Sequence, residues 1–239
     1  MNLCIDIGNT NAKAGIFDDD VLIEVRTNLL DRHIIRILKE YKPDHVLISS
    51  VRKGVGKVVQ KSSKITDTLV FSHKTPVPFN NQYQTPETLG LDRMASVAGA
   101  NGLYPAKNSL VVDIGTCITY DLIDKSGTYH GGGISPGVEM KLKAMHKFTS
   151  KLPDIAFKGT PELMGKTTKE CMLSGVMHGT VCELEGIIYR YKQFFEDLNI
   201  IFCGGGAKFF ESKIKEPIFA IPNLVLIGLN RILRYNLND

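Results

Sequence analysis

The stretch Leu3-Cys4-Ile5-Asp6-Ile7-Gly8-Asn9-Thr10-Asn11-Ala12-Lys13 sets the architecture that we expect of the whole chain. Its first residues are apolar and β-favouring around one acid, which predicts a buried strand. A carboxylate at Asp6 is costly in such a strand unless it is paired, hydrogen-bonded or turned towards a ligand. Gly8 then allows the backbone to approach a ligand closely, and Asn9 and Thr10 can donate hydrogen bonds to phosphate oxygens.

The residues after this turn predict a second strand. Ala12, Ala14 and Ile16 alternate with Lys13 and Gly15, which is the period of two that is typical of a strand. A strand–turn–strand unit differs from the Rossmann and Walker A nucleotide-binding loops, which need a helix at this point. Taken alone, the stretch fits either an ordinary hairpin with a turn-rich tip or a phosphate-binding loop.

A second stretch repeats the pattern. It runs Leu110-Val111-Val112-Asp113-Ile114-Gly115-Thr116-Cys117-Ile118-Thr119-Tyr120-Asp121, again an acid-bearing strand, a glycine, a hydroxyl and an alternating strand. Two such copies imply a duplicated nucleotide-binding half. The pattern resembles the actin, hexokinase and Hsp70 ATPase superfamily. This resemblance implies an α/β fold of duplicated ribonuclease H-like domains, with mixed five-stranded sheets flanked by helices and a cleft between the halves 1–103 and 104–239.

Composition argues against a nucleic-acid or membrane partner. The 239 residues carry a net charge of only +4, with 23% charged and 43% hydrophobic residues and no basic stripe. The cysteines are odd in number and form no CxxC pair, which favours reduced thiols in a cytoplasmic protein over disulfides or a zinc site. We see no signal peptide, and the longest apolar stretch is too short to span a bilayer.

The rest of the chain predicts strands and helices in mixed order. Thr167 and Glu170 have the spacing of a capping box at the start of the longest helix. Hydrophobic periodicity and turn residues indicate the other elements. We expect strands near 21–27, 45–51, 69–71 and 200–203, helices near 34–41, 54–63, 94–102, 138–147, 168–195 and 224–235, and a polar loop at 76–86.

Three features allow two interpretations each. Asp92 lies where a helix begins, so it is either a cap or dipole partner or a functional acid. The glycines at 131–133 let the backbone pass close to a ligand or to a neighbouring strand. Gly175 and Gly179 share a helix face that permits a close crossing, either within the chain or with a second subunit.

An ordered set of motifs carries a more specific resemblance. The chain is similar to the type III pantothenate kinase family over nearly its whole length. Each motif is weak alone, but their order is specific, and Gly-x-Asp-Arg between the two loops separates this family from sugar kinases and actin-like proteins. The motifs are Asp6-Ile-Gly-Asn-Thr-Asn-Ala-Lys13, Leu89-Gly-Leu-Asp-Arg93, Val112-Asp-Ile-Gly-Thr116, Gly131-Gly-Gly-Ile-Ser-Pro-Gly137, Gly165-Lys-Thr-Thr168 and Cys203-Gly-Gly-Gly-Ala207.

The resemblance implies an enzyme that uses ATP to phosphorylate the primary hydroxyl of pantothenate, the first step of coenzyme A biosynthesis. It implies a homodimer, Asp92 as the catalytic proton acceptor, and a monovalent cation, K⁺ or NH₄⁺, at Asp113. The implied ATP contacts are Asp6, Ile7, Gly8, Asn9, Thr10, Asn11, Ala12, Lys13 and Thr116. The implied pantothenate contacts are Tyr83, Gly90, Leu91, Asp92, Arg93 and Thr168.

The residue types suit phosphoryl transfer, which needs positioning and charge compensation more than covalent chemistry. Asp6 is a candidate Mg²⁺ ligand, because Mg²⁺ prefers carboxylate and water oxygens. Arg93 offers a guanidinium fork that matches the pantothenate carboxylate. Cys117 and Cys203 depart from the family pattern, where alanine and threonine are common, and both are small enough to affect only nucleotide packing.

Two other classes of function compete with this interpretation. A related superfamily kinase would use another small hydroxyl or a carboxylate as acceptor. A non-catalytic nucleotide-binding regulatory protein would bind ATP without any acceptor, and it gives no reason for Asp92-Arg93 beside a polar loop. A transcriptional accessory role is disfavoured by the absence of a basic groove.

Overall fold

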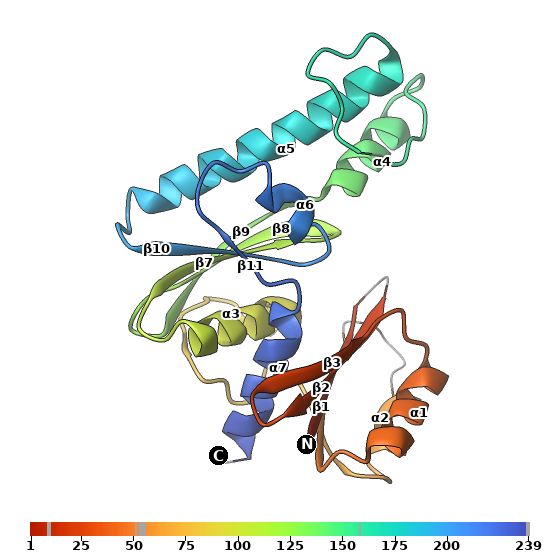
Figure 1. Cartoon of the computed structure of the whole chain (residues 1–239), viewed down its shortest axis with the longest axis vertical. Helices are drawn as coiled ribbons and strands as arrows, with labels where there is room; N and C mark the ends of the chain where they lie inside the picture. The colour runs from red at the N-terminus through yellow and green to blue at the C-terminus, as the bar shows by residue number, and fades with distance from the viewer. Residues whose placement is uncertain (9–10, 51, 53–55, 158, 238–239) are drawn as a thin grey trace. The chain divides into compact units, whose positions relative to one another are not determined.

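The computed structural model describes residues 1–8, 11–50, 52, 56–157 and 159–237. The chain divides into two compact units, which we call unit 1 and unit 2 (Figure 1). Unit 1 comprises Met1–Ala106, Ile123–His130 and Asn223–Asp239, and unit 2 comprises Lys107–Leu122 and Gly131–Pro222. No helix in the described ranges is long and apolar enough to cross a membrane.

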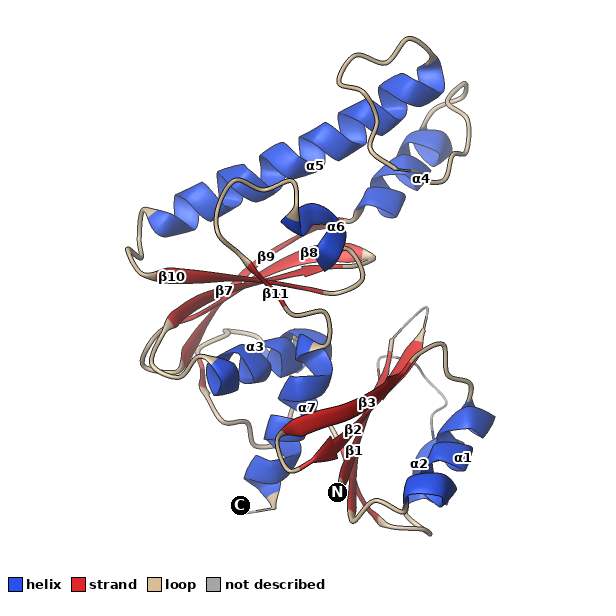
Figure 2. Cartoon of the chain, viewed as in Figure 1, coloured by secondary structure: helices blue, strands red, loops and turns tan. Residues whose placement is uncertain are grey.

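Unit 1 is built on a five-stranded sheet with helices on both faces (Figure 2). The strand order is β3-β2-β1-β4-β5, with β1 antiparallel to β2 and parallel to β4. The strands are β1 (Asn2–Ile7), β2 (Ala12–Asp18), β3 (Val21–Arg26), β4 (His45–Ser50) and β5 (Asp67–Val70). The helices are α1 (Asp31–Tyr41), α2 (Gly56–Ser62), α3 (Leu91–Leu103) and α7 (Leu224–Asn236).

The alternation along β1 assigns its side chains to two different cores. Leu3, Ile5 and Ile7 pack with α1 and α2 on one face of the sheet. Cys4 packs on the other face, with the buried residues of α3 and α7. Since neighbouring side chains of a strand point to opposite faces, Asp6 belongs to the α3 face.

Unit 2 holds most of a second sheet, which α5 and α6 cover on one face (Figure 1). The order of this sheet is β11-β10-β7-β8-β9-β6. Its strands are β6 (Asn80–Asn81), β7 (Asn108–Ile114), β8 (Cys117–Ile123), β9 (Thr128–Pro136), β10 (Leu198–Cys203) and β11 (Phe219–Ala220). The helices of the unit are α4 (Val138–Phe148), α5 (Thr168–Lys192) and α6 (Ala207–Glu211).

The two sheets repeat one topology, as the paired Asp-Ile-Gly motifs predict. The order β3-β2-β1-β4-β5 recurs as β9-β8-β7-β10-β11, and in both sheets the first strand is parallel to the fourth. The prediction of five strands is wrong for the second sheet, which has β6 as a sixth. This strand lies inside the segment 76–86 that we expected to be a loop, because Asn80 and Asn81 pair with Thr128 and Tyr129.

The compact units are drawn differently from the expected halves 1–103 and 104–239. Residues 123–130 and 223–239 belong to unit 1. The reason is burial, since Ile123, Tyr129 and Leu229 join the core that α3 forms. The division at residue 103 therefore stays a proposal about the duplicated fold, and it does not describe the units of packing.

Candidate functional site

Asp6 lies at the end of β1, where the sheet surrounds it with polar neighbours. In register it pairs with Lys13 on β2 and with Ser49 on β4, and residues in register on adjacent strands project from the same face. Burial of the carboxylate and the negative charge of Asp92 together raise the pKa of Asp6 to about 6, and the positive charge of Lys13 opposes the shift. Unit 1 therefore brings together two of the three predicted acids and one predicted lysine.

Asp92 lies in the first turn of α3, where helix geometry leaves its carboxylate exposed. Gly90 is the N-cap residue, and no side chain caps this helix end. The Arg93 backbone N–H donates to Asp92 Oδ1 at 2.9 Å. A Cβ on Gly90 would lie 2.4 Å from the same oxygen, so only glycine allows this position of the carboxylate. Asp92 is therefore not an N-cap, and its acid is available to a ligand.

Tyr83 and Arg93 are in contact beside Asp92. The Arg93 guanidinium carbon lies 5.8 Å from the centroid of the Tyr83 ring, and this ring stacks on Tyr129 at 6.2 Å between centroids. Arg93 is only 5% exposed, so its side chain is buried beside these two rings. The predicted pantothenate residues on the segment 83–93 thus form one continuous group in unit 1.

Two further residues of unit 1 support this group, and the sequence did not predict their roles. Ser49, which flanks Asp6, is 2% exposed at the end of β4. His73 Nε2 lies 2.8 Å from the Leu89 carbonyl oxygen, directly before Gly90. The polar tip of a buried strand was a signal for Ser49, but nothing local indicated that His73 contacts a loop so far along the chain.

The tip of the first hairpin is closed by its backbone. The Gly8 N–H donates to the Asn11 carbonyl at 3.0 Å, as expected for a tight turn between two strands. Ile7 and Ala12 are each 3% exposed and pack among apolar residues of the α1 face, so their side chains do not face a ligand. Asn9 and Thr10, both predicted ATP contacts, lie outside the described residues.

The second loop, which is the Gly115–Thr116 turn after β7, lies in unit 2 and is also closed by backbone hydrogen bonds. Gly115 N–H donates to the Cys117 carbonyl at 2.9 Å, and Gly137 N–H donates to the Thr116 carbonyl at 3.0 Å. A Cβ on Gly204 would lie 2.2 Å from Asp113 Oδ1, which shows how closely the backbone of the glycine run 204–206 approaches this acid. Unit 2 thus places Asp113 and Thr116 at one end of its sheet, with glycine backbone against them.

Asp113 is carried by strand β7, whereas Thr168 is carried by α5. It is the first residue of α5, after Thr167, and the predicted capping box with Glu170 is confirmed. Glu183, which bonds Lys141 near the start of α4, lies on the same helix about 22 Å further along at 1.5 Å per residue. Thr168 therefore lies about four helical turns from Glu183 and its contacts.

The structure also shows the surroundings of the two sets of glycines for which the sequence allowed two interpretations. The glycines at 131–133 lie in β9, and a Cβ on Gly132 would collide with the Tyr120 carbonyl, so here the close neighbour is a strand. Cβ atoms on Gly175 and Gly179 would meet nothing within 4 Å, so no crossing helix occupies their face among the described residues.

Asp6 fits a cation that needs few protein ligands. Within the described ranges no three histidine, cysteine or acidic side chains gather as a metal site. Mg²⁺ often keeps several waters and takes one or two protein carboxylates, which is what Asp6 offers. The raised pKa of Asp6 fits such a role, because a bound cation would offset the cost of its buried charge.

Comparison with known proteins identifies the family. The family model described as type III pantothenate kinase matches residues 2–190. The chain belongs to this family. A type III pantothenate kinase of Cytophaga hutchinsonii is 41% identical over 236 residues, covering 99% of this chain and 100% of the relative. One from Phocaeicola vulgatus is 42% identical over 240 residues, covering 99% of each chain.

Solved structures agree with the superfamily fold. A Campylobacter jejuni protein described as a Baf family transcriptional activator superposes with a TM-score of 0.67 at 21% identity, covering 99% of this chain and 100% of that one. The ROK hexokinase of Thermus thermophilus gives 0.50 at 11% identity, covering 98% and 99%. At these identities the likeness concerns the fold alone, and the match to the ROK hexokinase agrees with the hexokinase-like fold that the sequence predicts.

Proposed function

We propose that this protein transfers the γ-phosphoryl group of ATP to the primary hydroxyl of pantothenate, giving 4′-phosphopantothenate, the first step towards coenzyme A. Membership of the type III pantothenate kinase family supports the reaction. The observation that carries the site is the exposed carboxylate of Asp92, which lies beside Arg93 and close enough to Asp6 to raise its pKa.

In this proposal Asp92 accepts the hydroxyl proton as the new P–O bond forms. Such general-base assistance is typically worth about 10²–10⁴-fold in rate. Arg93 binds the pantothenate carboxylate, and Tyr83 supports its guanidinium. Gly90 keeps the space that the acid needs, because any side chain there would displace it.

The nucleotide contacts belong to the same proposal. We assign them to the hairpin Asp6–Lys13 and to Thr116, where glycine backbone and hydroxyl groups can reach phosphate oxygens. Asp6 holds Mg²⁺, which when bound neutralises charge on the transferred phosphoryl group. Asp113 holds K⁺ or NH₄⁺, since a single carboxylate suits a weakly held monovalent ion. The cytoplasm is the proposed location, as expected for reduced cysteines.

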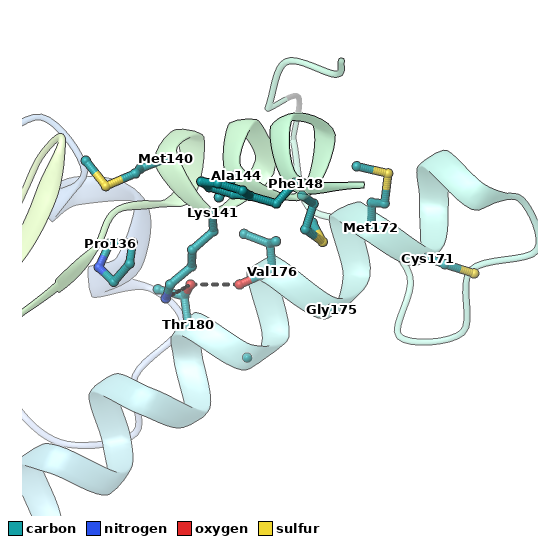
Figure 3. A pocket seen from close by; sticks show the side chains of 12 residues that line it. Pro136, Met140, Lys141, Ala144, Phe148, Cys171, Met172, Gly175, Val176 and Thr180 are labelled. Carbon is teal, nitrogen blue, oxygen red and sulfur yellow. Dashed lines mark hydrogen bonds between the residues drawn. The ribbon is translucent and has the colours of Figure 1, made fainter. Parts of the chain in front are cut away.

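A homodimer completes the proposal. α4 and α5 form an apolar groove of about 740 Å³ that includes Met140, Phe148, Met172 and Gly175 (Figure 3). We propose that a second copy of this chain covers it, because Phe148 is 80% exposed and the glycine face of α5 is open. A partner would also give Thr168 a role, because Thr168 lies at the start of α5, about 22 Å along this helix from Glu183.

An ADP-release assay with a panel of acceptors tests the proposed reaction. The acceptors are pantothenate, simple sugars and acetate, each with and without K⁺. Among these acceptors, we expect only pantothenate to cause release of ADP from ATP. Release with sugars or acetate instead would identify a kinase with another acceptor. ATP binding without ADP release for any acceptor would favour a regulatory nucleotide-binding protein.

A further inference from the structure

A cluster of polar side chains in unit 2 is not used by the proposed reaction. Its centre is Glu183, in the second half of α5. Tyr120 Oη donates to Glu183 Oε1 at 2.8 Å, and Ser135 Oγ donates to the same oxygen. Lys141 Nζ donates to Glu183 Oε2 at 2.6 Å and to Thr180 Oγ1 at 2.9 Å (Figure 3 shows Lys141 and Thr180).

Burying the charges of this cluster costs desolvation free energy. Lys141 and Glu183 are each only 22% exposed, so both charges are largely withdrawn from water. Partly buried ion pairs gain little stability over apolar residues, but they fix the relative positions of the elements that carry them. The hydrogen bonds and the lysine charge keep the pKa of Glu183 below its ordinary value against the opposing effect of burial.

The partners of Glu183 lie on both sides of Gly137. Ser135 is near the end of β9, and Lys141 is one turn into α4, whose N-cap residue is Gly137. Two bonds from Glu183 therefore hold the short segment 135–141 to α5. Gly137 lies against the second loop so closely that only glycine fits there, since a Cβ would lie 2.3 Å from the Gly115 carbonyl oxygen and 2.6 Å from that of Thr116.

Gly137 connects this segment to the loop. Its N–H donates to the Thr116 carbonyl at 3.0 Å, while the Gly115 N–H bonds Cys117 within the loop. We infer that Glu183 is a positioning residue, which acts through Ser135, Lys141 and Gly137 to hold the Gly115–Thr116 loop in the shape that binds ATP phosphates. The inference rests on the proposed function, which assigns Thr116 to the nucleotide.

The experiment measures nucleotide binding and kinetics of Glu183→Gln in the full-length protein. A non-hydrolysable ATP analogue with Mg²⁺ is titrated by calorimetry, and KM is measured for both substrates. We expect the Kd of the analogue and the KM for ATP to rise about tenfold. The KM for pantothenate should stay within about twofold, because the described hydrogen bonds to Glu183 come from Tyr120, Ser135 and Lys141, none of which is assigned to that substrate.

A second ion pair in unit 2 provides the matched control. Lys192 Nζ and Glu216 Oε2 lie 2.5 Å apart, with 36% and 35% of these side chains exposed, and none of the hydrogen bonds described for the chain joins either residue to the segment 135–141. Glu216→Gln should leave the Kd of the analogue unchanged. An equal loss of nucleotide binding in both variants would overturn the inference, because it would reflect general destabilisation.

Ser135→Ala guards against a failure of Glu183→Gln to fold. It removes one hydrogen bond nearest to Gly137 and keeps the ion pair, so we expect a rise in the Kd of the analogue of about threefold. Wild-type protein that binds the analogue, with unchanged affinity in both variants, would overturn the inference alone. Wild-type protein that binds no analogue would overturn the proposed function together with it.

Discussion

Asp6 shows how a single carboxylate depends on its surroundings. Because its pKa in the folded protein is about 6, against 3.8 ordinarily, the folded state binds this proton more tightly than the unfolded state. Between these two pH values the folded state holds more protons, so the contribution of Asp6 to stability falls as the pH rises. The group is mostly charged only above about pH 6, where a bound cation would offset the cost of its buried charge.

Carboxyl ¹³C NMR of the free protein should detect this titration. We expect Asp6 to titrate with a midpoint near pH 6, and at lower pH in Asp92→Asn, which removes a neighbouring negative charge. Asp124 is an internal control. Hydrogen bonds from Ser126 and His130 outweigh its desolvation and lower the pKa to about 2, so it should not titrate there. An Asp6 midpoint near 4 would contradict the prediction.

Asp92→Asn also tests the proposed proton acceptor. The amide keeps the size of the side chain but cannot take the hydroxyl proton, so kcat should fall by roughly 100- to 10,000-fold. The fold and ATP affinity should be retained, since Asp92 is exposed and does not cap α3. ADP release and calorimetry with ATP measure the two effects, and near-normal kcat would exclude Asp92 as the base.

Asp113→Ala addresses the monovalent cation. We expect the variant to lose most of the dependence of its turnover on K⁺ or NH₄⁺, because its carboxylate is the proposed ligand. Turnover is compared across a series of KCl concentrations, with NaCl holding the ionic strength constant. A cation response equal to that of the wild type would remove the assignment.

At the scale of elements, close packing of α3 against α7 holds unit 1 together. A Cβ on Gly228 would lie 1.7 Å from the Ala95 carbonyl oxygen, and one on Gly99 would lie 2.7 Å from that of Leu224. The backbones can approach this closely only because both helices carry glycine at the crossing. This contact draws the end of the chain into unit 1 and supports the helix that begins with Asp92.

Gly228→Ala should therefore destabilise the protein by about 1–3 kcal/mol, as overpacking does in a filled core. Gly186→Ala is the matched control in α5, where an added Cβ meets nothing within 4 Å. It should stabilise the protein by about 0.5–1 kcal/mol, because alanine loses less backbone freedom than glycine in a helix. Urea unfolding measures both changes, and equal effects of the two would contradict the packing argument.

At the scale of the whole molecule, the apolar groove between α4 and α5 predicts self-association. Phe148→Glu places a charge on the groove and should convert the dimer to monomer. Phe194→Glu is the control, since Phe194 is 81% exposed in unit 2 but lies outside the groove. Sedimentation velocity gives the oligomeric state. A wild-type monomer, or equal dissociation of both variants, would show that this face is not the interface.

Local patterns in the sequence were enough to predict both acid-bearing hairpins, their duplication and the Thr167 cap. Alternation with a period of two, glycine turns and capping preferences act between residues a few positions apart, so they can be recognised without a structure. The motif set also led to the family, which the comparisons confirm. The sixth strand was missed because β6 is two polar residues whose pairing with β9 has no local signal.

Only the tertiary structure decided which of these residues meet. It brings Asp92 close enough to Asp6 to raise its pKa, places Arg93 beneath Tyr83, and returns α7 to unit 1. It also places Thr168 about 22 Å along α5 from Glu183, which bonds Lys141. These relations depend on packing between segments far apart in the chain, where burial and shape fix the neighbours and local propensity does not.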